Sequence, residues 1–594
     1  MSKNGIINLH NYMEVKQKSQ LIRIAMFQTD FEDPKYMPAS RDLSLSKQKL
    51  IWNWMQCGMK YGNETEDKDV CHPSVVGENM KKLKLYLQKA VNLELTTIPP
   101  YFTAWLSLQT EYARNLKVAR QIKSIYTEEM LHMSIAANIL NSIGGTVNLT
   151  NIEEIPIYPT KLGSGSFFEL APGLQVTLQK FSKGLIKDIF MEIELPSPDR
   201  DRKDFKQIVG LWKRLPVQGS GGTISTNMDQ LLQEFEGEVV DESYDDNQET
   251  LAATEKLQLQ RKWERVKNHA SKMLKISPYG INTIGSLYTK ITLFLTALES
   301  CAKIDGLNNI GPGTIFVGDP IKQLNMSYWY NPAMVSDLKT VSKFWSSEIS
   351  KEELVLNERQ TSFKIKRVER DSFPPGSDLV SPLFPITDLK SAIQGVVEII
   401  YQGEGGSPCS PFKSAKPGGT LSLQTSHYVR FMEIVHGRTL VQMKRPSVDS
   451  EISCLNLTLF DCPNKLKSDE AFCFAGDEIA FYEDGVWPIV SNPTPTMYKP
   501  GTDAHHFNHQ FNIQYTRLLF CLESAFGGNP SKMRSCMSYM YDLIITGKRL
   551  VRSPVGVTKD TFITQPTCSN CHASPTWDFI RDKSERSGFP LIIG

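Results

Sequence analysis

Glu129 and His132 stand three residues apart inside an apolar stripe, and this pair is the strongest sign of chemistry in the sequence. Together with this pair, the residues of the stripe are spaced three and four apart, which is the spacing of one buried face of an α-helix. The other members of the stripe are Ile122, Ile125, Ala136, Ile139 and Ile143. Burying an unpaired charge costs several kcal/mol unless a partner or a metal ion offsets it. Glutamate and histidine one turn apart are also a ligand pair of di-iron four-helix bundles. The pair therefore predicts a metal site, with a hydrogen-bonded core pair as the alternative. The repeat points Glu128 about 100° away, and we expect it to be solvated.

Glu94 interrupts a second apolar stripe, on the helix predicted just before the first. The other members of that face recur at the same helical intervals: Leu83, Leu87, Ala90, Thr97 and Tyr101. Pro99 and Pro100 follow, and we expect them to kink or break the helix, because proline has no N–H and its ring clashes with the preceding turn. A broken turn beside a buried carboxylate would suit substrate entry, or it would simply mark the helix end.

Glu404 and His427 are the candidates in the second half of the chain. Glu404 continues the apolar seam of a predicted helix, whereas Glu398 falls on its more polar face. His427 shares a face with apolar residues and Glu433 falls on another, although a lone histidine on such a face is more often a core residue than a ligand. Carboxylates and histidines recurring in buried stripes are harder to explain without a metal. Oxygen and imidazole donors suit iron or manganese better than a structural zinc ion.

Four segments resemble a known family, the ferritin-like iminophenyl-pyruvate dimer synthases. The segments are Glu94-Leu95-Thr96-Thr97-Ile98-Pro99-Pro100-Tyr101, Glu128-Glu129-Met130-Leu131-His132, Gln402-Gly403-Glu404-Gly405 and Ser426-His427-Tyr428-Val429-Arg430-Phe431. The family includes the enzymes of violacein and rebeccamycin biosynthesis that couple two indole-pyruvate imines. The likeness covers roughly residues 79–550. It implies a mainly α fold, a ferritin-like helical bundle with long loop insertions and small irregular or β segments. Its dinuclear iron site would use Glu94, Glu129, His132, Glu404 and His427 as metal and catalytic residues.

One position departs from the family pattern. Where the family reads Thr-Ile-Gly-Glu-Phe-Tyr, residues 283–288 of this chain place Ser286 at the carboxylate of the third helix. Glu192 or Glu194, on a short predicted helix before Pro196, is the candidate replacement. Without a replacement, the second metal is weakly held, or the site is mononuclear or inactive.

The resemblance implies a metal-dependent oxidase or oxygenase. It would use dioxygen on a small substrate, such as an aromatic or amino-acid-derived compound or an imine, with a redox partner as a further expectation. Two alternatives stay open. One is a non-enzymatic iron or haem protein of storage or electron transfer, and the other is a degenerate ferritin-like binding protein.

The C-terminal segment contains a Cys-x-x-Cys-His motif made of Cys568, Cys571 and His572. This motif attaches haem c, with the histidine as an axial ligand. The segment around Met37 resembles the end of a small cytochrome c, in which a methionine is the second axial ligand. Head and tail together would form a permuted cytochrome-like module, and a haem-free pair of termini packed on the bundle is the alternative.

The 594 residues carry a formal net charge of +1, so charge favours neither nucleic acid nor an anionic membrane as a partner. No apolar run is long enough to span a bilayer, and the first residues do not read as a secretory signal. We therefore expect a soluble, cytoplasmic protein whose 11 cysteines are mostly reduced. Cys454, Cys462 and Cys473 are nevertheless close enough in sequence to pair.

Composition and helical pattern divide the chain into successive parts. They are an N-terminal segment with the cytochrome-like pattern (1–75), a helical bundle (76–437) with a polar, acidic insertion (218–262), a small β or irregular segment (438–500), two helices packing on the bundle (501–552) and a tail with the Cys-x-x-Cys-His motif (553–594).

Overall fold

The computed structural model describes residues 70–111, 114–162, 170–197, 255–276, 281–325, 383–405, 425–444, 470–555 and 570–581, without residues 172 and 282 and with residue 328 added. The chain divides into two compact units, Met1–Val75 and Val76–Gly594, and the second holds the candidate residues from Glu94 to His427. Met37, Cys568 and residues 218–254 of the predicted insertion lie outside the described residues, whereas residues 255–262 of that insertion belong to a helix.

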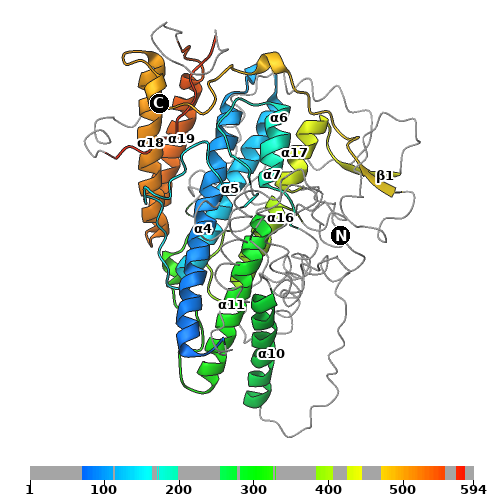
Figure 1. Cartoon of the computed structure of the whole chain (residues 1–594), viewed down its shortest axis with the longest axis vertical. Coiled ribbons are helices and arrows are strands. Elements are labelled where there is room, and N and C mark those ends of the chain that lie inside the picture. Colours follow the sequence, from blue (N-terminus) through cyan, green and yellow to red (C-terminus); the bar gives the residue numbers. More distant parts are fainter. Residues whose placement is uncertain are drawn as a thin grey trace, which may run out of the picture. The chain divides into compact units, whose positions relative to one another are not determined.

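Long α-helices dominate the described residues, which confirms the prediction of a mainly α fold (Figure 1). They are α4 (Pro73–Leu106), α5 (Leu116–Ser142), α10 (Glu255–Ile276), α11 (Ile284–Leu307), α16 (Leu389–Gly403), α17 (His427–His436), α18 (Asp503–Phe526) and α19 (Met533–Leu550). α10 lies along α11, and α16 lies against both α11 and α5. α18 and α19 form a helical hairpin that packs on α5. α5 therefore has neighbours on two sides, and α4 packs against it through the rings of Phe102 and Tyr126, whose centroids lie 5.3 Å apart.

One hydrophobic core joins these helices. Fully buried side chains come from α4, α5, α11, α16 and α18, for example Leu87, Ile122, Leu295, Ile393 and Leu519. Glu129 is 1% exposed and His132 is 2% exposed, although both are polar. The stripe that contains these two polar residues among apolar ones is therefore a buried face of α5.

α4 continues through Pro99 and Pro100 to Leu106, so of the two predicted outcomes the break was wrong, and the kink stays a prediction. Pro100 has no N–H to offer the carbonyl oxygen of Thr96 one turn earlier. The hydroxyl of Tyr158 donates to that oxygen over 2.7 Å and replaces the missing bond. Both prolines are buried, so packing also holds this part of the helix. Glu94 consequently lies within a continuous helix rather than at an open end.

The short helix predicted before Pro196 is present but irregular. It begins as α6 (Lys183–Leu185), passes through a π-helical turn, η2 (Ile186–Phe190), and ends as α7 (Met191–Ile193). A π turn adds one residue to the helical repeat, and such turns are frequent at functional sites. Glu194 is the first residue after α7, and it is 1% exposed. The irregular helix therefore ends by placing a carboxylate in the interior.

The β structure is small. β1 (Val441–Lys444) and β2 (Glu470–Cys473) form an antiparallel pair in which Val441 lies opposite Cys473. Near the end of the chain, the indole of Trp577 packs on Phe102, Phe511 and Tyr515 at centroid distances of 5.5, 4.8 and 5.1 Å. This aromatic cluster ties the C-terminal segment to α4 and α18.

All six cysteines among the described residues are disulfide-bonded, which contradicts the expectation of mostly reduced thiols: Cys71, Cys301, Cys473, Cys521, Cys536 and Cys571. The bond between Cys521 and Cys536 joins α18 to α19. Disulfides form and persist in oxidising compartments, so they weigh against the cytoplasmic location, which stays a prediction.

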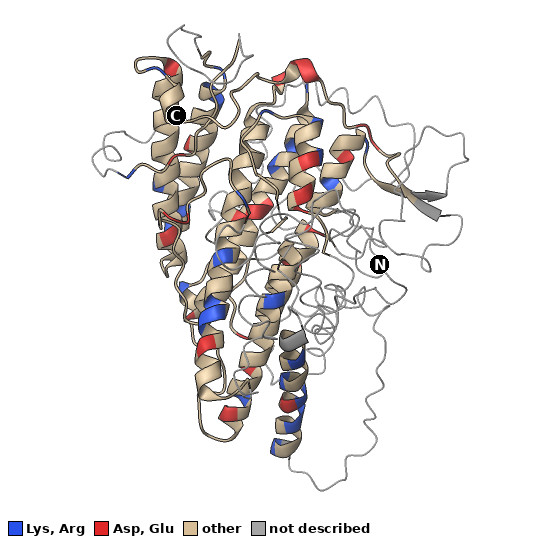
Figure 2. Ribbon diagram, viewed as in Figure 1, with Lys and Arg blue, Asp and Glu red and all other residues tan. Residues whose placement is uncertain are grey.

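Positions of basic and acidic residues alternate along the helices in Figure 2, in keeping with the net charge of +1. Among the helices that the structure describes, none combines the length and the apolarity needed to cross a membrane.

Candidate metal centre

Two groups of buried side chains in the second unit are arranged so that each could hold a metal ion. One consists of Glu94, Glu129 and His132, and the other of Glu129, Glu194 and His427. Within each group the candidate ligand atoms lie within 4.8 Å of one another. Glu129 belongs to both groups, so the described residues form one centre with two adjacent positions.

The two carboxylate oxygens of Glu129 face different histidines. Its Oε2 lies 3.7 Å from Nδ1 of His132, and its Oε1 lies 2.7 Å from Nδ1 of His427. Nδ1 of His132 is also 3.8 Å from Glu94, and Nδ1 of His427 is 3.6 Å from Glu194. The two imidazole rings stack with centroids 5.3 Å apart. This geometry suits a carboxylate that bridges two cations, with one histidine and one further glutamate on each side.

Each histidine has an acceptor at its other ring nitrogen. Nε2 of His132 lies 2.9 Å from Oε1 of Gln402, and Nε2 of His427 lies 3.0 Å from Oε2 of Glu128. In the neutral form of each ring, an acceptor at Nε2 holds the proton there, and the lone pair of Nδ1 then faces the centre, where a cation could bind it. Outer partners of this kind fix the tautomer and the ring orientation of metal-binding histidines.

Two buried tyrosines hold the outer glutamates. The hydroxyl of Tyr288 donates to Glu94 Oε1 over 2.6 Å, and the hydroxyl of Tyr101 donates to Glu194 Oε1 over 2.8 Å. Burial raises the pKa of both phenols well above the ordinary value, so they stay protonated as donors. Each donor occupies one oxygen of its glutamate and leaves the Oε2 atom for the centre.

The centre concentrates negative charge in a dry interior. Burial raises the pKa of Glu94 and Glu129, and a neighbouring carboxylate raises each further. Burial also raises the pKa of Glu194, but the imidazole of His427 more than offsets this and leaves it lowered. Burial lowers the pKa of His132. For His427 burial acts in the same direction, but the surrounding carboxylates, Glu129 first, raise the pKa well above its ordinary value.

The side chains of the two groups suit a bound cation better than pairing among themselves alone. Oε1 of Glu129 and Nδ1 of His427 are buried without a hydrogen-bond partner, although they lie close together. Among the described residues, no lysine or arginine pairs with Glu94, Glu129 or Glu194. The raised pKa of His427 favours its imidazolium as the counter-charge when no metal is bound, and a metal ion would take the place of the proton between Nδ1 of His427 and Oε1 of Glu129.

A family model described as Ferritin-like matches residues 87–436, which is more than half of the chain. The chain belongs to the ferritin-like family. Comparison with curated proteins and with solved structures finds no match in either set. The matched range contains all the residues of the two groups, so the ferritin-like part of the chain is also the part that carries the candidate centre.

The structure does not bring Glu404 into the ferritin-like centre. This carboxylate is buried, but it accepts hydrogen bonds from the N–H and hydroxyl of Ser197 at 2.8 and 2.7 Å and from the N–H of Gly285. A Cβ at position 285 would lie 2.4 Å from Oε2 of Glu404, so only glycine allows this approach. Glu404 follows the last residue of α16, and it links the chain after Glu194 to the start of α11.

Ser286 stands where the family pattern has a carboxylate, and it has a different role in this chain. Ser286 forms a capping box with Thr283 at the start of α11, so its hydroxyl serves the helix end. Glu194, one of the two candidate replacements, belongs to the group with Glu129 and His427 that could hold a metal ion. Glu192, the other candidate, is in neither group.

Glu128 was predicted to be solvated, and this was wrong. Its side chain is 15% exposed, pairs with Arg430 and faces His427. Burial raises the pKa of this carboxyl, but Arg430 and His427 together hold it well below its ordinary value. The helical repeat places Glu128 off the buried stripe, as expected. Nothing in the sequence indicates that α17 covers this second face of α5.

Gln402 and Tyr288 were also missed, since a neutral amide and a phenol carry no metal-binding signal of their own. Tyr101 could have been noticed in the sequence, because it lies on the same helical stripe as Glu94. A hydroxyl on the same helix face as a candidate ligand could have been predicted to be a hydrogen-bond partner in the centre.

The haem motif gains no support from the described residues. Cys571 is disulfide-bonded, and a thiol in a disulfide is not free to form a thioether with haem. Nδ1 of His572 lies 2.8 Å from the carbonyl oxygen of Val551, and its ring packs on Trp487. With Met37 and Cys568 outside the described residues, haem c stays a prediction.

Proposed function

We propose that this ferritin-like protein is a di-iron oxidase or oxygenase, with Glu94, Glu129, His132, Glu194 and His427 as its metal ligands. The observation that carries the proposal is Glu129, whose two oxygens face two different histidines across one buried cluster. Iron accepts mixed carboxylate and imidazole donors. Iron bound there would supply electrons and open coordination positions for dioxygen.

The chain's own residues would prepare this centre before any substrate arrives. Tyr288 and Tyr101 turn the free oxygens of Glu94 and Glu194 inward. Gln402 and Glu128 orient the two imidazoles. Side chains locked by hydrogen bonds of this kind need little reorganisation when a cation binds. The burial of every ligand keeps bulk water from competing for the site.

Iron content of the full chain, purified from an iron-rich medium, tests the ligand set. The proposal expects about two irons per chain in the wild type. Glu194→Gln should keep about one of them, because Glu194 belongs to only one group. Glu404→Gln is the matched control, a buried glutamate beside the centre that lies in neither group, and it should keep both. No iron in the wild type, or equal loss in the two variants, would overturn the assignment. Many irons per chain would instead favour iron storage.

The substrate proposal rests on the resemblance alone. We propose a small amino-acid-derived imine or aromatic compound, coupled or oxidised as in the iminophenyl-pyruvate dimer synthases. Dioxygen is the second substrate, and a redox partner would re-reduce the iron. The test is to incubate the iron-loaded protein with imines made in place from aromatic amino acids and to follow dioxygen uptake and product mass. Dioxygen uptake that is unchanged by any imine would refute this substrate class.

A further inference from the structure

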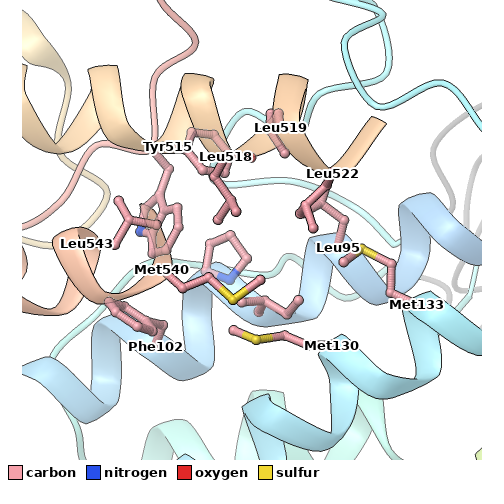
Figure 3. Close-up of a pocket in the computed structure, with 13 residues that line it drawn as sticks. Leu95, Phe102, Met130, Met133, Tyr515, Leu518, Leu519, Leu522, Met540 and Leu543 are labelled. Atoms are coloured by element: carbon pink, nitrogen blue, oxygen red, sulfur yellow. The ribbon is translucent and has the colours of Figure 1, made fainter. Parts of the chain in front are cut away.

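A small cavity lies on the other side of α4 and α5, between these helices and the hairpin of α18 and α19 (Figure 3). Its volume is about 30 Å³. Apolar side chains line it from all four helices, and Trp577 closes it from the C-terminal segment. The figure shows the side chains of Met130, Met540, Leu518 and Leu543 converging on it.

On both α4 and α5, residues that line the cavity directly follow the proposed ligands in the sequence. Leu95 follows Glu94, and Met133 follows His132. Met130 in turn follows Glu129. Successive residues of an α-helix point about 100° apart, so each helix turns a ligand to the metal centre and an apolar neighbour to the cavity. Only the width of the α4–α5 pair separates the two.

Size and polarity together select the kind of occupant. A water molecule needs roughly 10–15 Å³ in this measure and two to four polar partners, whereas a cavity that binds benzene measures about 150 Å³. At about 30 Å³ the cavity excludes an aromatic substrate. Tyr515 brings a buried hydroxyl that lacks a hydrogen-bond partner, and the rest of the lining is apolar apart from the indole N–H of Trp577, which already donates to Thr103. One free polar group cannot hold a water well, so the cavity suits a small nonpolar molecule.

We propose that this cavity is a binding site for dioxygen beside the metal centre. Dioxygen is a nonpolar diatomic molecule that prefers an apolar cavity to water, as the hydrophobic effect requires. A binding site on the other side of α4 and α5 would raise the local concentration of dioxygen near the metal centre. The cavity itself does not depend on iron, but its role as a dioxygen site rests on the proposed function.

Xenon binding to the metal-free full chain tests the cavity without using activity. Xenon is a nonpolar atom of similar size, and the methyl signals of Met130, Met133 and Met540 in NMR spectra would report its arrival. We expect these signals to shift with xenon pressure. Leu543→Phe, on α19 and remote from the ligands, should fill the cavity and abolish the shifts. Leu543→Met keeps the volume nearly constant and should preserve them. Thermal unfolding of both variants shows whether the added ring has disturbed the fold.

The dioxygen role is tested on the iron-loaded protein by stopped-flow oxidation of the reduced form at several dioxygen concentrations. We expect Leu543→Phe to slow oxidation several-fold at low dioxygen with unchanged iron content, and Leu543→Met to match the wild type. Absence of xenon shifts overturns the cavity site while iron binding stands. Xenon shifts with an unchanged oxidation rate in Leu543→Phe overturn the dioxygen role. A chain that binds xenon but takes up no iron overturns the proposed function, and the dioxygen role with it.

Discussion

Replacing Glu129 with glutamine should have opposite effects on the metal-free and the iron-loaded protein. Burial and the charge of Glu194 raise the pKa of Glu129 above its ordinary 4.5. The folded state therefore binds this proton more tightly than the unfolded state, so its contribution to stability is greatest below about pH 4.5 and is lost as the pH rises through the folded value. Above the folded value the charged carboxylate destabilises the metal-free fold. Glutamine has the same shape without the charge, so the metal-free variant should unfold at a higher temperature than the wild type.

The iron-loaded protein should respond in the other direction. A ligand at a hundred times its Kd stabilises the folded state by about 2.7 kcal/mol. Unfolding entropy is about 2.1 cal/mol/K per residue, so a cooperative unit of roughly 350 residues has about 0.7 kcal/mol/K, and each bound ion raises Tm by about 4 °C. Glu129 belongs to both groups, so Glu129→Gln should lose this increase for both ions.

Differential scanning calorimetry with and without ferrous iron, in the absence of dioxygen, measures both effects. Glu299→Gln is the control. Glu299, on α11, is also a buried glutamate with a pKa raised by burial, but it accepts a hydrogen bond from the N–H of Ile315 and lies in neither group. It should keep the full iron response. A Glu129→Gln protein that loses stability in both states, or that retains the iron-induced rise, would refute the bridging role.

Further predictions concern the residues around the ligands. Tyr288→Phe should weaken iron binding, since Glu94 loses a hydrogen bond whose net contribution is about 1–2 kcal/mol, and competition with a chelator measures this loss. Glu128→Gln should lower the affinity of one iron about 10–100-fold, because the carboxylate no longer orients His427, and the same titration should leave the other iron unchanged. Cys521→Ser should cost about 3 kcal/mol at 25 °C, given the 15-residue separation of the bonded cysteines, as measured by urea unfolding under non-reducing conditions.

The ligands on regular helices could be predicted from the sequence. Glu94, Glu129 and His132 each interrupt an apolar repeat of three and four residues, and α4 and α5 keep that repeat without interruption. A polar residue held on such a face must be buried, whatever the rest of the fold does. The regular period was therefore sufficient to predict that all three side chains are buried, whereas their proximity depends on how α4 packs against α5.

Glu194 and Glu404 show where this reasoning ends. The π turn of η2 shifts the repeat by one residue before Glu194, so no period read from the sequence points that side chain inward. Glu404 fits the apolar seam of α16, but the helix ends at Gly403 and the carboxylate turns to Ser197 and Gly285 instead. Both residues stand at a helix end, where tertiary contacts and not the helical period decide the direction of a side chain.

The two halves of the centre repeat one arrangement with one difference. On each side of Glu129 there is a glutamate bonded to a tyrosine and a histidine with an outer acceptor: Glu94, Tyr288, His132 and Gln402 on one side, and Glu194, Tyr101, His427 and Glu128 on the other. The acceptor is a neutral amide in the first half, but in the second it is a carboxylate that Arg430 keeps ionised. An ionised acceptor makes an imidazole a stronger donor to a metal than an amide does. The group with Glu194 and His427 should therefore bind its ion more tightly. The ion bound by Glu94 and His132, on the helices that line the cavity, should exchange its ligands more readily.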